Sequence, residues 1–132
     1  MVSGVSGQPR EGEAAATGRF GIEVRPVAGT LVLVLAGELD YDTAEPLRDA
    51  LNEGVKALPG RIVVDCAGLE FCDSTGLNVL LRARIEAAEA GSGLELSALQ
   101  PQVARMFDIT GADTVFQVHN SLDAALADRR QS

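Results

Sequence analysis

Residues 31–39 form the stretch that most constrains the fold of this 132-residue chain. Leucine, valine and alanine follow one another there, without the alternation that marks a strand with one face in water. Such a run is typical of a strand buried on both faces, as in the centre of an α/β sheet. It is also far too short to cross a bilayer, so the sequence predicts no membrane span.

The rest of the chain switches between strand and helix patterns. Residues 20–25 alternate with strand period and, after a turn at 26–30, can pair with the apolar run as a hairpin. Further on, apolar residues recur at spacings of three and four, which is typical of amphipathic helices. The first expected helix is capped by Asp42 or Thr43, has Pro46 in its first turn and runs to residue 58. The other expected elements are helices at 77–90, 101–109 and 121–129, and strands at 61–65, 94–98 and 114–118.

This order, β-β-α-β-α-β-α-β-α, predicts an α/β fold with a mixed, mostly parallel sheet of about five strands and four helices. The length suits a single domain, which we expect over residues 19–130. Residues 1–18 are rich in Gly, Ser, Ala and Glu, and we expect a flexible N-terminal tail there.

Charge and cysteine content exclude several classes of protein. A net charge of −8 disfavours nucleic acid as a partner, because phosphates would be repelled. The N-terminus has no apolar block typical of a secretory signal, so we expect a cytoplasmic protein. Cys66, Cys72 and the single histidine, His119, lack the number and spacing of a zinc site. We therefore expect no metal, and two reduced cysteines in the core.

The chemistry-bearing residues fall in two loops that each leave a strand. One is the loop at 37–43, which contains Asp40, and the other is the sequence Asp73-Ser74-Thr75-Gly76. In sheets of this kind the carboxyl ends of the strands carry the functional groups, so the two loops could share one surface. Asp40 must face water or meet a specific partner, because it ends a buried strand.

Two interpretations are open for Asp73 and Ser74. Either side chain could cap the following helix by accepting a hydrogen bond from a first-turn N–H, which contributes about 1 kcal/mol. Alternatively, Ser74 is a phosphorylation site, since the N-terminus of a helix favours negative charge. Nucleophilic catalysis is disfavoured because no motif surrounds His119, and neither glycine-rich phosphate-binding loop is present. We expect no enzymatic activity and no cofactor.

In combination these motifs resemble the STAS domain of the bacterial anti-sigma factor antagonists. The resemblance rests on Gly37-Glu38-Leu39-Asp40 followed by Thr43, on Asp73-Ser74-Thr75-Gly76-Leu77, and on the late segment at 103–111. It covers residues 20–129, nearly all of the expected domain.

The resemblance implies a partner-switching mechanism. The unmodified protein would bind an anti-sigma factor that is also a serine kinase, and so release a sigma factor for transcription. Phosphorylation of Ser74 would separate the complex, and a phosphoserine phosphatase would reverse it. Thr75 is a less favoured second phosphoacceptor. The residues expected to bind the partner are Asp40, Thr43, Asp73, Ser74, Thr75, Gly76 and Asn78.

Three other functions compete with this one. The same fold could serve as a ligand-sensing or scaffold module that binds a small anion or nucleotide at the loop 73–76. An enzyme could use Asp40 and Asp73 as paired carboxylates. An acyl carrier protein is also small and acidic with a serine at a helix start, but it is a helical bundle, and the strands expected at 31–39 and 61–65 contradict that fold.

Overall fold

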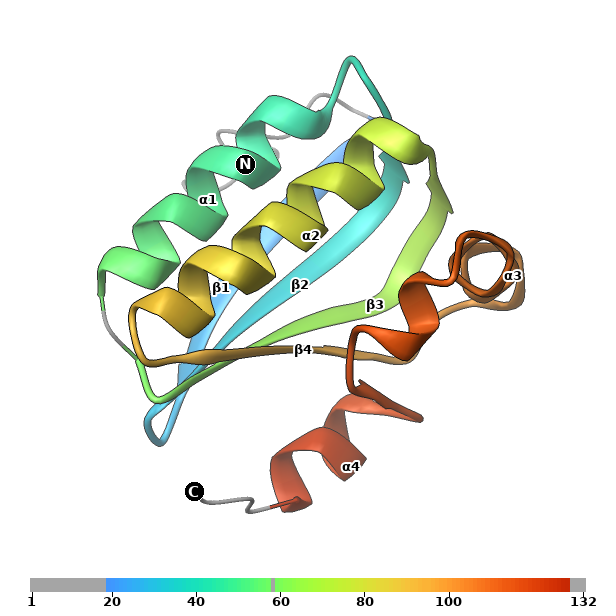
Figure 1. Ribbon diagram of the computed structural model, residues 1–132. Helices are drawn as coiled ribbons and strands as arrows, with labels where there is room; N and C mark the ends of the chain where they lie inside the picture. The colour runs from blue at the N-terminus through green and yellow to red at the C-terminus, as the bar shows by residue number, and fades with distance from the viewer. Residues whose placement is uncertain (1–18, 58, 129–132) are drawn as a thin grey trace, which may run out of the picture.

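The computed structural model describes residues 19–57 and 59–128. Strands and helices alternate along the described chain after an initial pair of strands (Figure 1). The elements are β1 Phe20–Val27, β2 Thr30–Leu39, α1 Ala44–Lys56, β3 Arg61–Cys72, α2 Ser74–Glu89, β4 Gly93–Ser97, α3 Pro101–Thr110, the 3-10 helix η2 Ala112–Thr114, β5 Val118–His119 and α4 Leu122–Ala127.

The five strands form one sheet in the order β1-β2-β3-β4-β5. β1 pairs with β2 in antiparallel fashion, and each later strand is parallel to its neighbour. The predicted hairpin and the predicted mixed, mostly parallel sheet are therefore confirmed. Parallel neighbours need crossover helices, and α1 and α2 supply the first two of these connections.

Helices α1 and α2 lie side by side over one face of the sheet (Figure 1). Their apolar stripes supply buried residues such as Leu47 and Leu51 from α1 and Leu80 from α2, and these pack on Leu33 and Val64 of the sheet. The main core of the domain is therefore the layer between this helix pair and strands β2, β3 and β4.

The opposite face of the sheet is more polar. Arg61 donates two hydrogen bonds to the carboxylate of Glu95, at 2.9 and 2.7 Å, and a third to the backbone oxygen of Ala125 in α4, at 2.6 Å. Nε2 of His119 lies 2.8 Å from the same carboxylate. Burial alone would raise the pKa of Glu95, but the hydrogen bonds from Arg61 and His119 outweigh it and lower that pKa. This cluster fastens α4 to the sheet.

Strand β3 is much longer than the strand predicted at 61–65. It continues to Cys72 because Leu69 and Cys72 still point into the core, and because pairing with β2 resumes after register shifts near Ala36 and Glu38. The turn predicted at 26–30 is shorter, since β1 and β2 stay paired up to Val27 and Thr30.

Two further expectations need correction. β2 is not buried on both faces throughout, because Ala36 and Glu38 are exposed beyond the part of the sheet that is covered.

The last strand is only Val118–His119. The 3-10 helix Ala112–Thr114 and a turn at 115–116 stand in place of the start of the expected strand, and they bury Ala112 and Phe116. Residues 58 and 129, the expected ends of two helices, lie outside the described residues.

Across residues 19–57 and 59–128, none of the helices has the length and apolar character needed to span a membrane.

Gly37 lets the start of β1 lie directly against the end of β2. Its φ is +97°, and a Cβ atom there would overlap the backbone oxygen of Arg19, which accepts a hydrogen bond from Glu38 N at 2.7 Å. We expect Gly37→Ala to lower the free energy of unfolding by about 2 kcal/mol or more, because it adds both backbone strain and a clash. Chemical denaturation measures this. Gly21→Ala, which meets no atom within 4 Å, is the control. Equal stability of the two variants would contradict this account.

Candidate functional site

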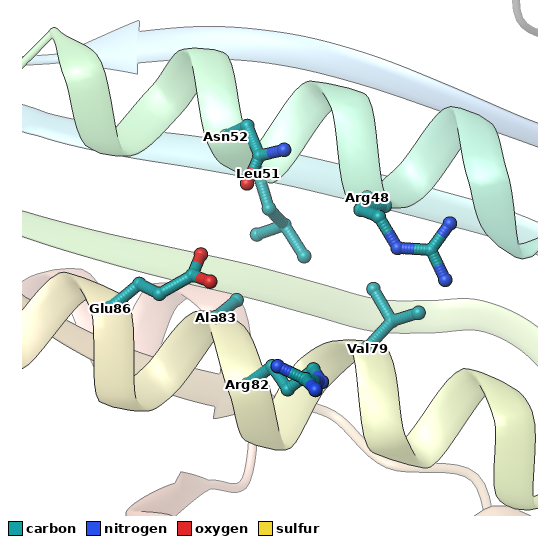
Figure 2. A pocket seen from close by; sticks show the side chains of 7 residues that line it. All are labelled: Arg48, Leu51, Asn52, Val79, Arg82, Ala83 and Glu86. Atoms are coloured by element: carbon teal, nitrogen blue, oxygen red, sulfur yellow. The ribbon is translucent and has the colours of Figure 1, made fainter.

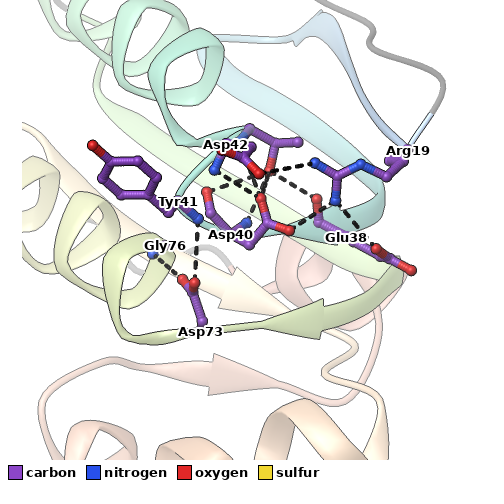
Figure 3. A network of polar contacts seen from close by, with 8 residues as sticks. Arg19, Glu38, Asp40, Tyr41, Asp42, Asp73 and Gly76 are labelled. Carbon is purple, nitrogen blue, oxygen red and sulfur yellow. Dashed lines mark hydrogen bonds and ion pairs between the residues drawn. The ribbon is translucent and has the colours of Figure 1, made fainter.

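The two loops picked out in the sequence meet at the carboxyl end of the sheet. Leu39 and Cys72 are paired at the ends of β2 and β3, and Asp73 N donates to the Leu39 backbone oxygen at 3.1 Å. The loop that begins at Asp40 therefore lies beside the start of α2 (Figure 3). The expectation that Asp40 and Asp73 share one surface is confirmed.

The carboxylate of Asp73 joins these two segments. Its Oδ1 accepts a hydrogen bond from Gly76 N at 3.0 Å, which caps α2, and its Oδ2 accepts from Tyr41 N at 3.2 Å. The backbone of Asp73 is extended, as is usual for a residue that precedes a helix. The capping interpretation therefore holds for Asp73, which also holds the neighbouring loop in place.

Ser74 is left free by this arrangement. It is the first residue of the 16-residue helix α2, and its side chain is exposed. Within the described part of the chain its hydroxyl has no hydrogen-bond partner, so it neither caps the helix nor contacts a catalytic base. An exposed, unused hydroxyl at the positive end of a helix dipole is well placed to accept a phosphoryl group.

Gly76 sets how closely α2 approaches the sheet. It is buried, and a Cβ atom there would lie 2.8 Å from Leu39 Cδ2 and 3.2 Å from Cys72 Sγ. The first turn of α2 can rest on the end of β2 only because this position lacks a side chain.

Asn78 is exposed and lies one turn after Ser74 on the same side of the helix, whereas Thr75 is partly exposed.

The loop between β2 and α1 is closed by its own side chains. Asp40 Oδ1 accepts from the backbone N–H groups of Asp42 and Thr43, at 2.9 and 3.2 Å. The Thr43 hydroxyl accepts from Asp40 N at 2.8 Å and donates to the Glu38 backbone oxygen at 2.9 Å. The expected side-chain cap of α1 is therefore wrong: Thr43 is the N-cap residue, but its buried hydroxyl is engaged within the loop.

Arg19 provides positive charge at this end of the sheet. Its guanidinium lies 2.8 Å from Asp40 Oδ2, 3.4 Å from Glu38 Oε1 and 3.8 Å from Asp42 Oδ2. The hydrogen bond from Arg19 lowers the pKa of Asp40 despite the opposing effect of burial. The sequence analysis missed this residue. The hairpin could have revealed it, because pairing Phe20 with Gly37 places Arg19 beside Glu38.

The backbone of Tyr41 is held in place while its side chain points outward. Its N–H donates to Asp73, yet 79% of the residue is exposed. Its ring projects away from the loop into solvent (Figure 3). Tyrosine is enriched among the residues that anchor protein–protein interfaces.

The two cysteines and the histidine take no part in this site. Cys66 and Cys72 are buried free thiols, and burial raises the pKa of each, which keeps both protonated. His119 is engaged with Glu95 on the sheet face that α2 does not cover. Among residues 19–57 and 59–128, no three His, Cys, Asp or Glu residues are grouped so as to hold a metal ion.

The chain is similar to a STAS family model and to proteins named as anti-sigma factor antagonists. The family model described as "Mlab, STAS domain" matches residues 22–128. A putative anti-sigma factor antagonist, BtrV of Bordetella bronchiseptica, is 33% identical over 101 residues, which cover 76% of this chain and 87% of BtrV. The anti-sigma-F factor antagonist RsfB of Mycobacterium tuberculosis is 32% identical over 98 residues, covering 74% and 80% of the two chains. The crystal structure of an anti-sigma factor antagonist from Mycobacterium paratuberculosis superimposes with a TM-score of 0.80 at 29% identity, covering 88% of this chain and 98% of that one.

The ion pair between Arg19 and Asp40 predicts a specific titration. We expect Arg19→Gln to raise the pKa of Asp40 towards its ordinary value, as followed by NMR of the carboxyl carbon. Because the pKa of Asp40 is lower in the folded state than in the unfolded state, its ionisation stabilises the fold above the unfolded-state pKa. That contribution is lost as the pH falls through the folded-state pKa. Arg25→Gln, which removes a similar contact with Glu23 elsewhere on β1, should leave Asp40 unchanged. An Asp40 pKa that is the same with and without Arg19 would contradict the assignment.

Proposed function

This chain belongs to the STAS domain family, and we propose that it is an anti-sigma factor antagonist that acts by partner switching through Ser74. The proposal rests on the different roles of Asp73 and Ser74 at the start of α2. Asp73 caps the helix and holds the neighbouring loop, while the adjacent hydroxyl of Ser74 is exposed and unused. The relatives BtrV and RsfB, whose names describe antagonists of anti-sigma factors, support the same role.

In the proposed cycle, the unphosphorylated protein binds an anti-sigma factor with serine kinase activity, and a sigma factor is released. The kinase binds ATP and magnesium and transfers the γ-phosphoryl group to the Ser74 oxygen. A new O–P bond forms, the bond to ADP breaks and the hydroxyl proton is lost. A phosphoserine phosphatase later hydrolyses the ester and restores the hydroxyl. This chain acts as ligand and substrate in these steps.

Electrostatics explains why the phosphate ends binding. A phosphoserine adds about −1.5 to −2 charges at neutral pH. The carboxylate of Asp73 is on the adjacent residue, and those of Asp40 and Asp42 are on the loop beside it, with Arg19 as their partner. A partner surface fitted to a neutral hydroxyl would meet like charge and lose solvation, which costs several kcal/mol.

The expected partner-binding residues divide by exposure. Ser74 and Asn78 are exposed, and Asp40, Asp73 and Thr75 are partly so. In our proposal these five residues meet the partner directly. Thr43 and Gly76 are buried and support the site without touching the partner. Thr43 closes the loop after β2, and Gly76 lets α2 rest on β2.

Anion sensing at the loop 73–76 is less well supported than partner switching. Gly76 N already donates to Asp73, and a bound anion would lie among the carboxylates of Asp40, Asp42 and Asp73. An enzymatic role for Asp40 and Asp73 is also poorly supported, because each carboxylate is engaged by backbone N–H groups and neither contacts the other.

The phosphorylation switch gives the first functional test. We expect Ser74→Ala to bind the anti-sigma kinase and to stay bound when ATP is added, whereas Ser74→Asp should bind at least about tenfold more weakly, since it places a charge in the contact. Co-purification on Ser74→Ala from the native organism captures the kinase, and mass spectrometry after incubation with ATP maps the modified residue. Thr75→Ala removes the second candidate phosphoacceptor and should still be phosphorylated at Ser74. Modification at another residue, or release of Ser74→Ala by ATP, would refute the proposal.

Tyr41 gives the second functional test. We expect Tyr41→Ala to weaken binding of the same kinase by about tenfold or more, as for other aromatic anchors at interfaces. The exposed ring contributes little to folding, so the melting temperature should stay close to that of the wild type. Calorimetry measures the affinity, with Tyr41→Phe as the control that keeps the ring. The chain has one tyrosine and no tryptophan, so NMR of tyrosine-labelled protein also follows this single ring on binding. A ring signal that the kinase leaves unchanged would contradict the assignment.

A further inference from the structure

A groove runs between α1 and α2 on the side away from the sheet (Figure 2). Its volume is about 320 Å³. Its floor is formed by three buried apolar residues, Leu51, Val79 and Ala83. Arg48 on α1 and Arg82 on α2 face it from opposite sides, and Asn52 and Glu86 line the part further from Ser74.

Two arginines line opposite sides of the groove. Acidic residues outnumber basic ones by 19 to 11, yet two arginines line this one groove. Both are exposed, and neither makes a salt bridge or side-chain hydrogen bond with any of residues 19–57 and 59–128. Glu86, one turn beyond Arg82, forms no ion pair with either of them. A guanidinium over an apolar floor binds an incoming carboxylate more strongly than it would in open water.

The groove begins close to the phosphorylation site. Arg82 lies eight residues after Ser74 on α2, about 12 Å along the helix at 1.5 Å per residue. Asn78 lies between them, so Ser74, Asn78 and Arg82 form one row of exposed residues on α2. A standard interface covers about 800 Å² on each partner, which corresponds to a patch roughly 30 Å across. A protein centred on Ser74 would therefore cover Arg82, and Arg48 lies across the groove from Arg82.

We propose that the anti-sigma partner inserts an acidic side chain into this groove, where Arg48 and Arg82 bind its carboxylate. The inference rests on the proposed function, since it extends the same contact surface along the helices. The charges also orient the partner. Its acidic group is attracted to the groove, while the anionic end near Ser74 repels acidic groups there. The groove thereby selects partners that carry an acid at this one position.

Charge reversal tests the proposal on the complete chain. All variants carry Ser74→Ala, so that no phosphorylation occurs, and the probe is the anti-sigma kinase captured by that variant. We expect Arg48→Glu and Arg82→Glu each to weaken binding about tenfold or more, with a smaller dependence of affinity on salt. Arg25→Glu makes the same change in charge on the other face of the sheet, and it should stay within about twofold of the parent.

The possible results distinguish the acidic contact in the groove from the Ser74 switch on which it rests. Arginine variants that bind like the Arg25→Glu control would overturn the acidic contact and leave the Ser74 switch intact. A Ser74→Ala protein that binds no kinase would overturn both. If a charge reversal unfolds the protein, as judged by circular dichroism, Arg48→Gln and Arg82→Gln replace it and should weaken binding in the same direction. Submillimolar binding of inorganic phosphate in the groove without the kinase, followed by NMR, would assign the groove to a free anion and overturn the proposal.

Discussion

The site depends on one carboxylate that serves two segments. Asp73 directly follows β3, caps α2 through Gly76 N and holds the loop after β2 through Tyr41 N. Without it, the first turn of α2 would lose its cap, and the loop that carries Asp40 and Tyr41 would lose its attachment to the helix. The positions of Ser74, Tyr41 and the neighbouring acids relative to one another follow from these two hydrogen bonds.

The surface around Asp73 carries charges of different sign in different places. Three carboxylates, on Asp40, Asp42 and Asp73, lie at the end of the sheet with Arg19 beside two of them. Along the helices, Arg48 and Arg82 line the groove together with one acidic residue, Glu86. In the proposed switch, a phosphate on Ser74 adds negative charge at the end of the sheet and leaves the two arginines of the groove unchanged. Such a surface can release a partner by changing the charge at one end alone.

Much of this arrangement could be predicted from the sequence. The apolar run at 31–39 and the helical spacings after it indicated the alternation of strands and helices, and the parallel order placed Asp40 and Asp73 at one end. The extension of β3 to Cys72 could not be predicted so readily, because Leu69 and Cys72 are separated by exposed residues and the pairing with β2 changes register between them. Arg19 and Arg48 could not be predicted for a related reason. Their roles arise from the packing of segments that are distant in the chain, and no local motif marks them.

In the proposed switch, the cap and the phosphoacceptor are different residues, Asp73 and Ser74. The Ser74 hydroxyl takes no part in the hydrogen bonds of Asp73, so a phosphate ester there leaves those bonds in place. Neither form would then require the domain to unfold. The fraction of molecules in each form would follow the balance between the kinase and the phosphatase that act on them.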